Sequence, residues 1–406
     1  MTPRALSGAT ILQIVPALRG DAAGHAAMDT ALLLLQGGAR TIIAGDDGDL
    51  VGELRALGGE FLPLGRETFN PVQLRGNARF LRDYVLTERV DIVHAHSAAS
   101  AWSALSALHE LPAWLVTSFP DAIARDTWLR RTYQGVLARG DRVIAPSSFV
   151  SLAMIERYGI APDRISVVPR SIDTAAFSAA AVSDAQIGAM RRAWGVLAGQ
   201  RVIFAPQPID ETNGQIAILE AMRLLIGLRG ERDTLLVLAD DAHRRSRAIR
   251  TLRERARAHG LDTLLRFAGP IDDEPHSVRG AAPPMTLALA AADVVVVTPS
   301  LPPPTARVVA EAQAMGRPVV VSATGTLPEH TLFPPRMPED LRTGWVVRAG
   351  HADETAQALH AVLSLNTTAY AALGARARQF AEFMFSPRSV AEATRAVYTS
   401  VLARDE

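Results

Sequence analysis

Residues Asp293 to Glu329 read DVVVVTPSLPPPTARVVAEAQAMGRPVVVSATGTLPE and indicate the fold of the second half of the chain. The uninterrupted apolar run, Val294–Val297, is typical of a strand buried on both faces. A proline-rich loop then leads to a predicted helix over about residues 305–315, and Val319–Val321 is predicted to form a second strand. Strand, helix and strand in this order make a βαβ unit, which binds ligands at the carboxyl ends of its strands.

The turn after the second of these strands consists mainly of small residues. It reads Thr324-Gly325-Thr326-Leu327-Pro328-Glu329. Backbone N–H groups in such a loop can meet an anionic ligand. We therefore expect Gly325, Thr326 and Leu327 to line a ligand site.

Short apolar runs alternate with helical patterns along the whole chain. Helices are predicted over about residues 25–35, 74–86 and 128–137. The other predicted strands are Thr10–Val15, Thr41–Ala44, Asp91–Ala95, Trp114–Thr117, Arg142–Ala145, Arg201–Ala205, Thr234–Ala239, Leu265–Ala268 and Trp345–Val347. Alternation of this kind predicts right-handed crossovers and parallel sheets. Since 406 residues exceed what one core usually holds, we expect two doubly wound, Rossmann-like α/β domains facing a cleft.

The expected domains cover residues 1–185 and 186–385, with a linker rich in alanine and serine between Ser171 and Gln200. A last helix, residues 386–406, begins with Ser386 as N-cap and Pro387 at its first position. Its apolar residues fall at helical spacing: Val390, Ala393, Val397, and Val401 or Leu402. A free surface helix is the alternative, but this apolar stripe favours a helix that crosses back to cover the first domain.

Composition restricts the classes of function. The chain is 48% hydrophobic with a mean hydropathy of +0.12, but it lacks the apolar run of about 20 residues that a membrane span needs. It shows no leader pattern and no cysteine, so we expect a cytoplasmic protein without disulfides. A net charge of zero gives no indication of nucleic acid as a partner. All basic residues are arginine, which excludes lysine chemistry.

Several motifs together resemble the retaining GT-B glycosyltransferases of family 4, closest to the bacterial envelope-polysaccharide and lipopolysaccharide type. They are Arg307, Glu311-Ala312-Gln313-Ala314-Met315-Gly316, Gly325, Glu329, Pro16-Ala17-Leu18, Val93-His94-Ala95-His96, Ala101-Trp102-Ser103, the stretch from Ala138 to Ala145 and the stretch from Arg164 to Arg170. The resemblance covers about the whole chain. It implies transfer of a hexose from a UDP- or GDP-linked sugar to a glycan or lipid-linked acceptor, with retention and without a metal or another cofactor.

The resemblance also implies roles for particular residues. Glu311 corresponds to the residue that binds the donor ribose. The other donor-binding positions are Arg307, Gly325, Thr326, Leu327 and Asn213, and the acceptor-side positions are Asp21, His25 and His96.

Four positions lack the charged or histidine side chain that the family has there. Pro303 replaces a glutamate that holds the transferred sugar, and Pro120 replaces a histidine near the reacting sugar. Pro208 and Asn213 replace an arginine and a lysine that neutralise the leaving diphosphate. Without these cations the developing negative charge is poorly stabilised, so transfer is predicted to be slow or absent. An inactive subunit of a partner glycosyltransferase, or a glycan- or nucleotide-binding module, is the alternative.

Other features allow two interpretations. Asp21 stands where the family has glycine, and it either faces the ligand or simply caps a helix. A shifted alignment would give Asp121 the role of the lost histidine. His94 and His96 lie on one side of a strand end; without a third ligand, a polar pair is favoured over a metal site.

Three further segments are rich in charged residues or proline. The stretch from Arg125 to Arg142, with Trp128 and Tyr133, is either a solvated helix or a contact with an anionic inner-membrane surface. The segments 272–284 and 334–339 are interpreted as loop insertions near the mouth of the expected cleft.

Overall fold

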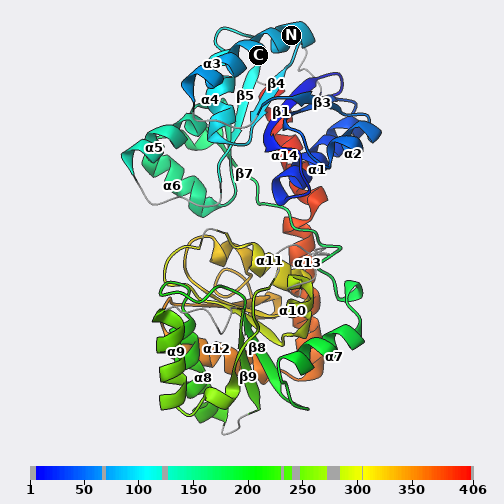
Figure 1. Ribbon diagram of the computed structural model, residues 1–406. Helices are drawn as coiled ribbons and strands as arrows, with labels where there is room; N and C mark the ends of the chain where they lie inside the picture. Colours follow the sequence, from blue (N-terminus) through cyan, green and yellow to red (C-terminus); the bar gives the residue numbers. More distant parts are fainter. Residues whose placement is uncertain are drawn as a thin grey trace. The chain divides into compact units, whose positions relative to one another are not determined.

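The computed structural model describes residues 6–65, 70–120, 127–229, 233–239, 247–271, 284–303 and 305–403, apart from the side chains of Ala22, Pro71, Leu228 and Arg229. The chain forms two compact α/β units (Figure 1). The first unit comprises Met1–Ser171 and Phe385–Glu406, and the second comprises Ile172–Met384. The predicted class, two doubly wound α/β domains, is confirmed.

The first unit is built on a seven-stranded parallel sheet with the order β3-β2-β1-β4-β5-β6-β7. Its strands are β1 Thr10–Ala17, β2 Arg40–Asp46, β3 Glu60–Pro63, β4 Ile92–Ala95, β5 Trp114–Ser118, β6 Arg142–Ala145 and β7 Ile165–Val167. Its helices are α1 Ala22–Gln36, α2 Val51–Ala56, α3 Pro71–Glu88, α4 Ala98–Ala107, α5 Trp128–Gln134, α6 Ser148–Tyr158 and α14 Pro387–Leu402. The strand order reverses between β1 and β4, and ligands of such sheets bind at the carboxyl ends of these two strands.

The second unit has a six-stranded parallel sheet with the order β10-β9-β8-β11-β12-β13. Its strands are β8 Arg201–Ala205, β9 Thr234–Leu238, β10 Leu265–Phe267, β11 Val294–Val297, β12 Val319–Ser322 and β13 Gly344–Val347. Its helices are α7 Asp184–Ala193, α8 Gln215–Arg229, α9 Arg247–Ala258, α10 Met285–Ala291, α11 Arg307–Ala314, α12 Ala352–Leu363 and α13 Thr367–Phe385. Here the order reverses between β8 and β11, with the buried valines of β11 at the centre of the sheet.

The two strands missed by the sequence analysis are edge strands. β3 and β7 contain no fully buried residue, whereas every residue of β4 and β11 is buried. A half-exposed edge strand needs no continuous apolar run, so its sequence gives a weak signal.

The helix predicted over residues 128–137 ends earlier than expected. α5 stops at Gln134, and the chain continues as a 3₁₀ turn over Gly135–Arg139. None of the helices in the described part of the chain combines the length and the apolar character that a membrane span requires.

The C-terminal helix α14 crosses back to the first unit, as predicted, and packs against α1 (Figure 1). Ser386 caps it by accepting a hydrogen bond from the N–H of Ser389 at 3.2 Å. Tyr398 is fully buried and Val401 nearly so, in the cluster that contains Ile11 and Ile92 of the sheet. The apolar stripe of α14 therefore completes the core of the first unit.

The division between the units lies at Ser171, before the boundary expected at residue 185. Phe177 is fully buried in the second unit. Arg378 of α13 donates to the carbonyl oxygens of Thr174 at 3.2 Å and Phe177 at 3.1 Å. These contacts attach the segment after Ser171 to the second unit, although its sequence resembles a linker.

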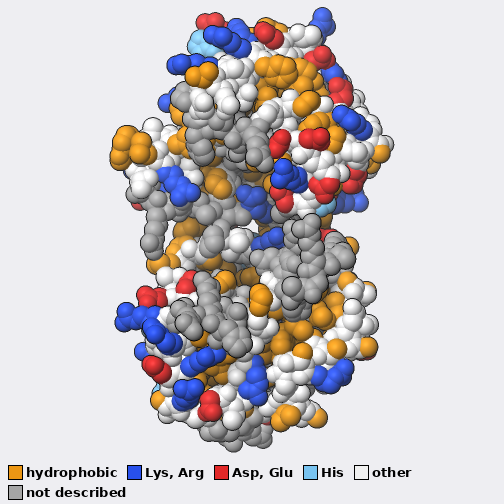
Figure 2. Space-filling model, viewed as in Figure 1, with side chains coloured by type: hydrophobic (Ala, Val, Ile, Leu, Met, Phe, Trp, Pro, Cys, Tyr) orange, Lys and Arg blue, Asp and Glu red, His pale blue; other side chains and the backbone are white. Residues whose placement is uncertain are grey.

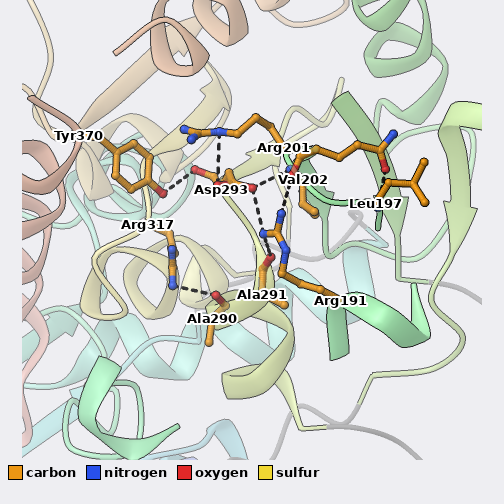
Figure 3. A network of polar contacts seen from close by, with 10 residues as sticks. Arg191, Leu197, Arg201, Val202, Ala290, Ala291, Asp293, Arg317 and Tyr370 are labelled. Atoms are coloured by element: carbon orange, nitrogen blue, oxygen red, sulfur yellow. Dashed lines mark hydrogen bonds and ion pairs between the residues drawn. The ribbon is translucent and has the colours of Figure 1, made fainter. Parts of the chain in front are cut away.

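Aspartates join neighbouring strands at their amino ends. Asp91 accepts a hydrogen bond from the N–H of Thr10 at 2.8 Å, and Asp141 accepts one from Leu115 at 2.8 Å. Figure 3 shows the corresponding residue of the second unit, Asp293.

Asp293 connects several elements of the second unit (Figure 3). Its Oδ2 accepts hydrogen bonds from the N–H of Val202 at 2.7 Å and from Arg191 at 3.1 Å. The side chain of Arg201 lies 3.4 Å from Oδ1, and Tyr370 donates to the Asp293 carbonyl at 2.8 Å. Because this network lies where the strands begin, it leaves their carboxyl ends free for a site.

Candidate functional site

Three loops of the second unit follow the two strands between which the strand order reverses, β8 and β11, and the neighbouring strand β12. We call them the β8 loop (206–214), the β11 loop (298–306) and the β12 loop (323–326). Ser300 donates through its N–H and its hydroxyl to the carbonyl oxygen of Thr212, at 2.7 and 3.0 Å. Ser322 donates to the carbonyl oxygen of Pro299 at 2.8 Å. The three loops therefore form one connected surface.

Gly214 is needed where the β8 loop enters α8. It has a φ of +82°, and an added Cβ would lie 2.0 Å from the carbonyl oxygen of Thr298. A larger residue would force the β8 and β11 loops apart. The next residue, Gln215, is buried and donates to the carbonyl oxygens of Gln207 at 3.1 Å and Pro208 at 2.8 Å, which holds the β8 loop against α8.

The side-chain amide of Asn213 is used within its own loop. Its Nδ2 donates to the carbonyl oxygen of Pro208 and to Asp210 Oδ2, both at 2.9 Å. Asp210 Oδ1 also accepts from the N–H groups of Thr212 and Asn213, at 2.7 and 2.8 Å. Asn213 therefore adds no positive charge and no free amide donor to the loop surface.

Glu311 and Arg307, both predicted in the donor site, form an ion pair on the first turns of α11. Arg307 Nε donates to Glu311 Oε1 at 2.6 Å. The Glu311 side chain is only 4% exposed, whereas that of Arg307 is 35% exposed. Glu311 is thus a buried carboxylate with a bound cation.

Of the three residues predicted to line a site after β12, Gly325 and Thr326 lie in the β12 loop, and Leu327 directly follows it. Leu327 is fully buried, and its N–H donates to the carbonyl oxygen of Thr324 at 3.2 Å within a turn. The N–H groups of Gly325 and Thr326 have no partner among the residues that the structure describes. Gly325 has a φ of +55°, and an added Cβ would lie 2.9 Å from Pro302 Cβ. The described geometry leaves two backbone donors for an anion, not three.

In the first unit, Asp21 is the N-cap of α1. Its Oδ1 accepts from the N–H of Gly24 at 2.8 Å. An added Cβ at Gly24 would lie 1.9 Å from the carbonyl oxygen of Arg19, so this turn requires glycine. Asp21 and His25 are both exposed at the edge of the sheet where β1 ends.

His96, the third predicted acceptor-side residue, follows β4 directly. Its Nε2 lies 3.2 Å from Gln13 Oε1, and Gln13 Nε2 donates to the carbonyl oxygen of Ala27 at 3.2 Å. Because Oε1 can only accept, Nε2 of His96 carries the proton. Burial, together with the charge of Arg170, lowers the pKa of His96 to about 4. A neutral His96 is therefore present at pH 7.

His94 belongs to a buried network that reaches α14. Its Nδ1 lies 2.6 Å from the hydroxyl of Tyr398, and its Nε2 lies 2.7 Å from Ser118 Oγ. The rings of His94 and His96 lie against each other at a tilt of 35°, with centroids 3.9 Å apart. Burial lowers the pKa of His94 well below its ordinary value and raises that of Tyr398, so both stay uncharged at neutral pH. Both nitrogens of His94 are occupied, which fits a structural polar pair and not a metal ligand.

No three metal-ligating side chains converge anywhere in the described ranges. A surface cavity of about 760 Å³ lies in the first unit, lined by Leu108, Trp114, Arg139 and Asp141 among others. These residues precede or begin β5 and β6, so the cavity opens at the amino ends of the strands, opposite the edge with Asp21 and His96. Asp121 and residues 272–283 lie outside the described residues, so the roles suggested for them stay predictions.

Two family models match the chain. Residues 33–176 match Glycosyltransferase Family 4, and residues 199–364 match Glycosyl transferases group 1. The chain contains a glycosyltransferase family 4 domain followed by a glycosyl transferases group 1 domain. The first match lies largely in the first unit and the second lies within the second unit.

Solved structures share the fold. A glycosyltransferase from Rickettsia africae has a TM-score of 0.75 at 22% identity, over 98% of this chain and 100% of that one. HepE from Anabaena, solved in complex with UDP, has a TM-score of 0.69 at 18% identity, over 97% of this chain and 100% of that one. At these identities the likeness establishes the GT-B fold alone.

Curated relatives match over shorter segments. D-inositol 3-phosphate glycosyltransferase of Corynebacterium aurimucosum is 27% identical over 232 residues, which are 57% of this chain and 50% of that protein. The GPI3 subunit of phosphatidylinositol N-acetylglucosaminyltransferase of Saccharomyces cerevisiae is 30% identical over 118 residues, which are 28% of this chain and 26% of that protein. The chain thus spans half or less of the length of the curated relatives it matches.

The residues that support the site of this glycosyltransferase carry weak sequence signals or none. Gln13 is fully buried in β1 and reaches His96, and its only sequence signal is a lone polar residue within an apolar run. Gln215 gives a similar signal, since it precedes the apolar pattern of α8. Tyr398 gives none, because its partner lies 304 positions earlier in the sequence.

Proposed function

We propose that this glycosyltransferase binds a UDP- or GDP-linked hexose at the β8, β11 and β12 loops of the second unit. The supporting observation is the connected surface of these loops beside the buried Glu311, the residue expected to bind the donor ribose. HepE, which shares the fold, has been solved in complex with UDP and with UDP-glucose. The hexose is transferred with retention to an acceptor at the first unit, where β1 and β4 end beside Asp21, His25 and His96.

The proposed acceptor is an envelope glycan or a lipid-linked sugar. Among the structures that share the fold is WaaG, a glycosyltransferase involved in lipopolysaccharide biosynthesis. An anionic inner-membrane surface would meet α5, where apolar side chains project in Figure 2. Trp128 is 73% exposed and Leu129 62%, followed by the exposed Arg130 and Arg131, and this helix carries no acidic residue. Aromatic and basic residues together suit such a surface.

Transfer is proposed to be slow. Asn213 is bound within its loop, and Pro208, Pro303 and Pro120 offer no side-chain donor. Stabilising the leaving diphosphate is usually one of the largest contributions to catalysis, so the loss of its cations lowers the rate.

An inactive subunit is the second candidate. It is favoured by the Asn213 amide, which is hydrogen-bonded within its own loop, and by the same three prolines. One relative is itself named as a subunit of a transferase. In this role the nucleotide site would act in binding or assembly with a partner glycosyltransferase.

A transfer assay separates the two candidates. The full chain would be incubated with radiolabelled UDP- and GDP-hexoses and a bacterial lipid and glycan extract, and product would be counted. We expect a rate far below about 1 s⁻¹, which is low for an ordinary enzyme. The double variant Pro208→Arg/Asn213→Lys is expected to bind the nucleoside diphosphate more tightly, because it restores two cations.

Turnover of about 1 s⁻¹ or faster by the unaltered chain would contradict the proposed slow transfer. Complete absence of product, with nucleotide still bound, would favour the subunit role. If neither UDP nor GDP bound, the proposed nucleotide site itself would be wrong.

A further inference from the structure

Arg307 holds Glu311 through only one atom of its guanidinium group. Nε donates to Glu311 Oε1 at 2.6 Å. The Nη groups of Arg307 have no hydrogen-bond partner in the part of the chain that the structure describes. The ion pair therefore orients the guanidinium plane and leaves its outer N–H donors open.

Arg307 is also the cation best placed to meet an anion at these loops. The β8, β11 and β12 loops contain no arginine, lysine or histidine, and Arg307 directly follows the β11 loop. The acidic Asp210 makes its hydrogen bonds inside the β8 loop, to Thr212 and Asn213. A nucleotide diphosphate at this edge would thus find one arginine and the unpartnered N–H groups of Gly325 and Thr326.

We propose that Arg307 binds the diphosphate of the nucleotide through its Nη groups and that Glu311 is a positioning residue that holds the guanidinium in place. This inference rests on the proposed nucleotide site. The planar fork of arginine matches pairs of phosphate oxygens, and charge-assisted hydrogen bonds of this kind are strong. A side chain already held by an ion pair also loses less conformational freedom when it binds.

This arrangement compensates in part for Pro208 and Asn213. It supplies one cation where two are absent, on α11 and not on the β8 loop. The consequence is binding of a nucleoside diphosphate that depends on Arg307, with weaker stabilisation of the leaving group than two cations would give.

Isothermal titration calorimetry on the full chain tests the proposal with three probes: UDP, uridine and inorganic pyrophosphate. Arg307→Met is expected to weaken UDP and pyrophosphate binding by about tenfold or more, because charge-assisted hydrogen bonds are lost. Uridine has no phosphate, so Arg307→Met is expected to bind it within about twofold of the affinity of the unaltered chain. Arg307→Lys keeps the charge without the planar fork, so its affinity for UDP and pyrophosphate is expected to lie between that of Arg307→Met and that of the unaltered chain.

Arg348 provides a matched control. It also pairs through Nε with a glutamate, Glu354, but it follows β13, at the edge of the sheet. Arg348→Met is expected to leave all three affinities unchanged.

Two substitutions of Glu311 test its positioning role. Glu311→Gln keeps an oxygen that can accept a hydrogen bond from Arg307 Nε, whereas Glu311→Leu does not. Glu311→Gln is therefore expected to retain a higher affinity for pyrophosphate than Glu311→Leu.

Thermal unfolding of each variant shows whether it remains folded. If a folded Arg307→Met or Arg307→Lys variant bound UDP as tightly as the unaltered chain, the proposal would be overturned. An equal loss for uridine and UDP would overturn it as well, because Arg307 would then act on the nucleoside part. Failure of the unaltered chain to bind either UDP or GDP would instead contradict the proposed nucleotide site.

Discussion

Gly214 is the residue on which the arrangement of the β8 and β11 loops depends most directly. Gly214→Ala is expected to destabilise the second unit and weaken nucleotide binding, because its Cβ would lie 2.0 Å from the Thr298 carbonyl oxygen. Gly350→Ala is the matched control: Gly350 also has a positive φ, +76°, but an added Cβ there would meet nothing within 4 Å. Both variants lose the ease with which glycine adopts this backbone, roughly 1 kcal/mol, and only Gly214→Ala adds a clash. Urea unfolding and UDP titration check the difference, and equal effects of the two variants would contradict it.

His94 and His96 are expected to make the protein less stable in mild acid. Both have a lowered pKa in the folded chain, about 4 for His96, whereas an unfolded histidine binds a proton near its ordinary value of 6.5. The unfolded state therefore binds more protons below about pH 6.5, and stability falls as the pH decreases through this window. His96 alone contributes a loss of about 1 kcal/mol between about pH 7.5 and about pH 5.5.

His96→Gln is expected to reduce this loss, since glutamine does not titrate. Urea unfolding at the two pH values measures it, with the exposed His109→Gln as the control. A pH dependence identical in the original chain and in His96→Gln would show that the imidazole is not kept neutral by the fold.

At the scale of elements, α14 is expected to be essential for the first unit. Its residues Tyr398 and Val401 are buried against Ile11 and Ile92, and Tyr398 also reaches His94. A chain ending at Phe385 would expose this apolar surface and leave the Nδ1 of His94 without its partner, so it is expected to aggregate or to unfold at a lower temperature.

A chain ending at Leu402 is the matched control, because it keeps the whole of α14. It is expected to unfold at the same temperature as the full chain in a calorimetric scan. If the chain ending at Phe385 also unfolded at that temperature, the contribution of α14 to the first core would be disproved.

The elements also show what a sequence can predict. Val294–Val297 was predicted as a buried strand because a central parallel strand needs a continuous apolar run, and β11 has these bounds. β3 and β7 were missed because edge strands carry half-exposed residues. The early attachment of Phe177 to the second unit was missed because it depends on Arg378, far away in the sequence.

For the whole molecule, local patterns predicted two doubly wound domains and a returning helix. They also indicated the loops of the candidate site, since these follow directly from strand order. The hydrogen bonds and ion pairs between side chains of the site could not be predicted from these local patterns. The amide of Asn213 and the pairing of Arg307 with Glu311 depend on how loops fold onto themselves, which spacing alone does not specify.

A nucleoside diphosphate is proposed to bind at the carboxyl ends of β8, β11 and β12. Hydrogen–deuterium exchange of the full chain, with and without saturating UDP or GDP, is the test. Bound nucleotide is expected to slow exchange in residues 206–214, 298–307 and 323–327 and to leave the amino ends of the same strands unchanged. Slower exchange confined to the first unit, or none in these loops when calorimetry shows the nucleotide bound, would contradict it.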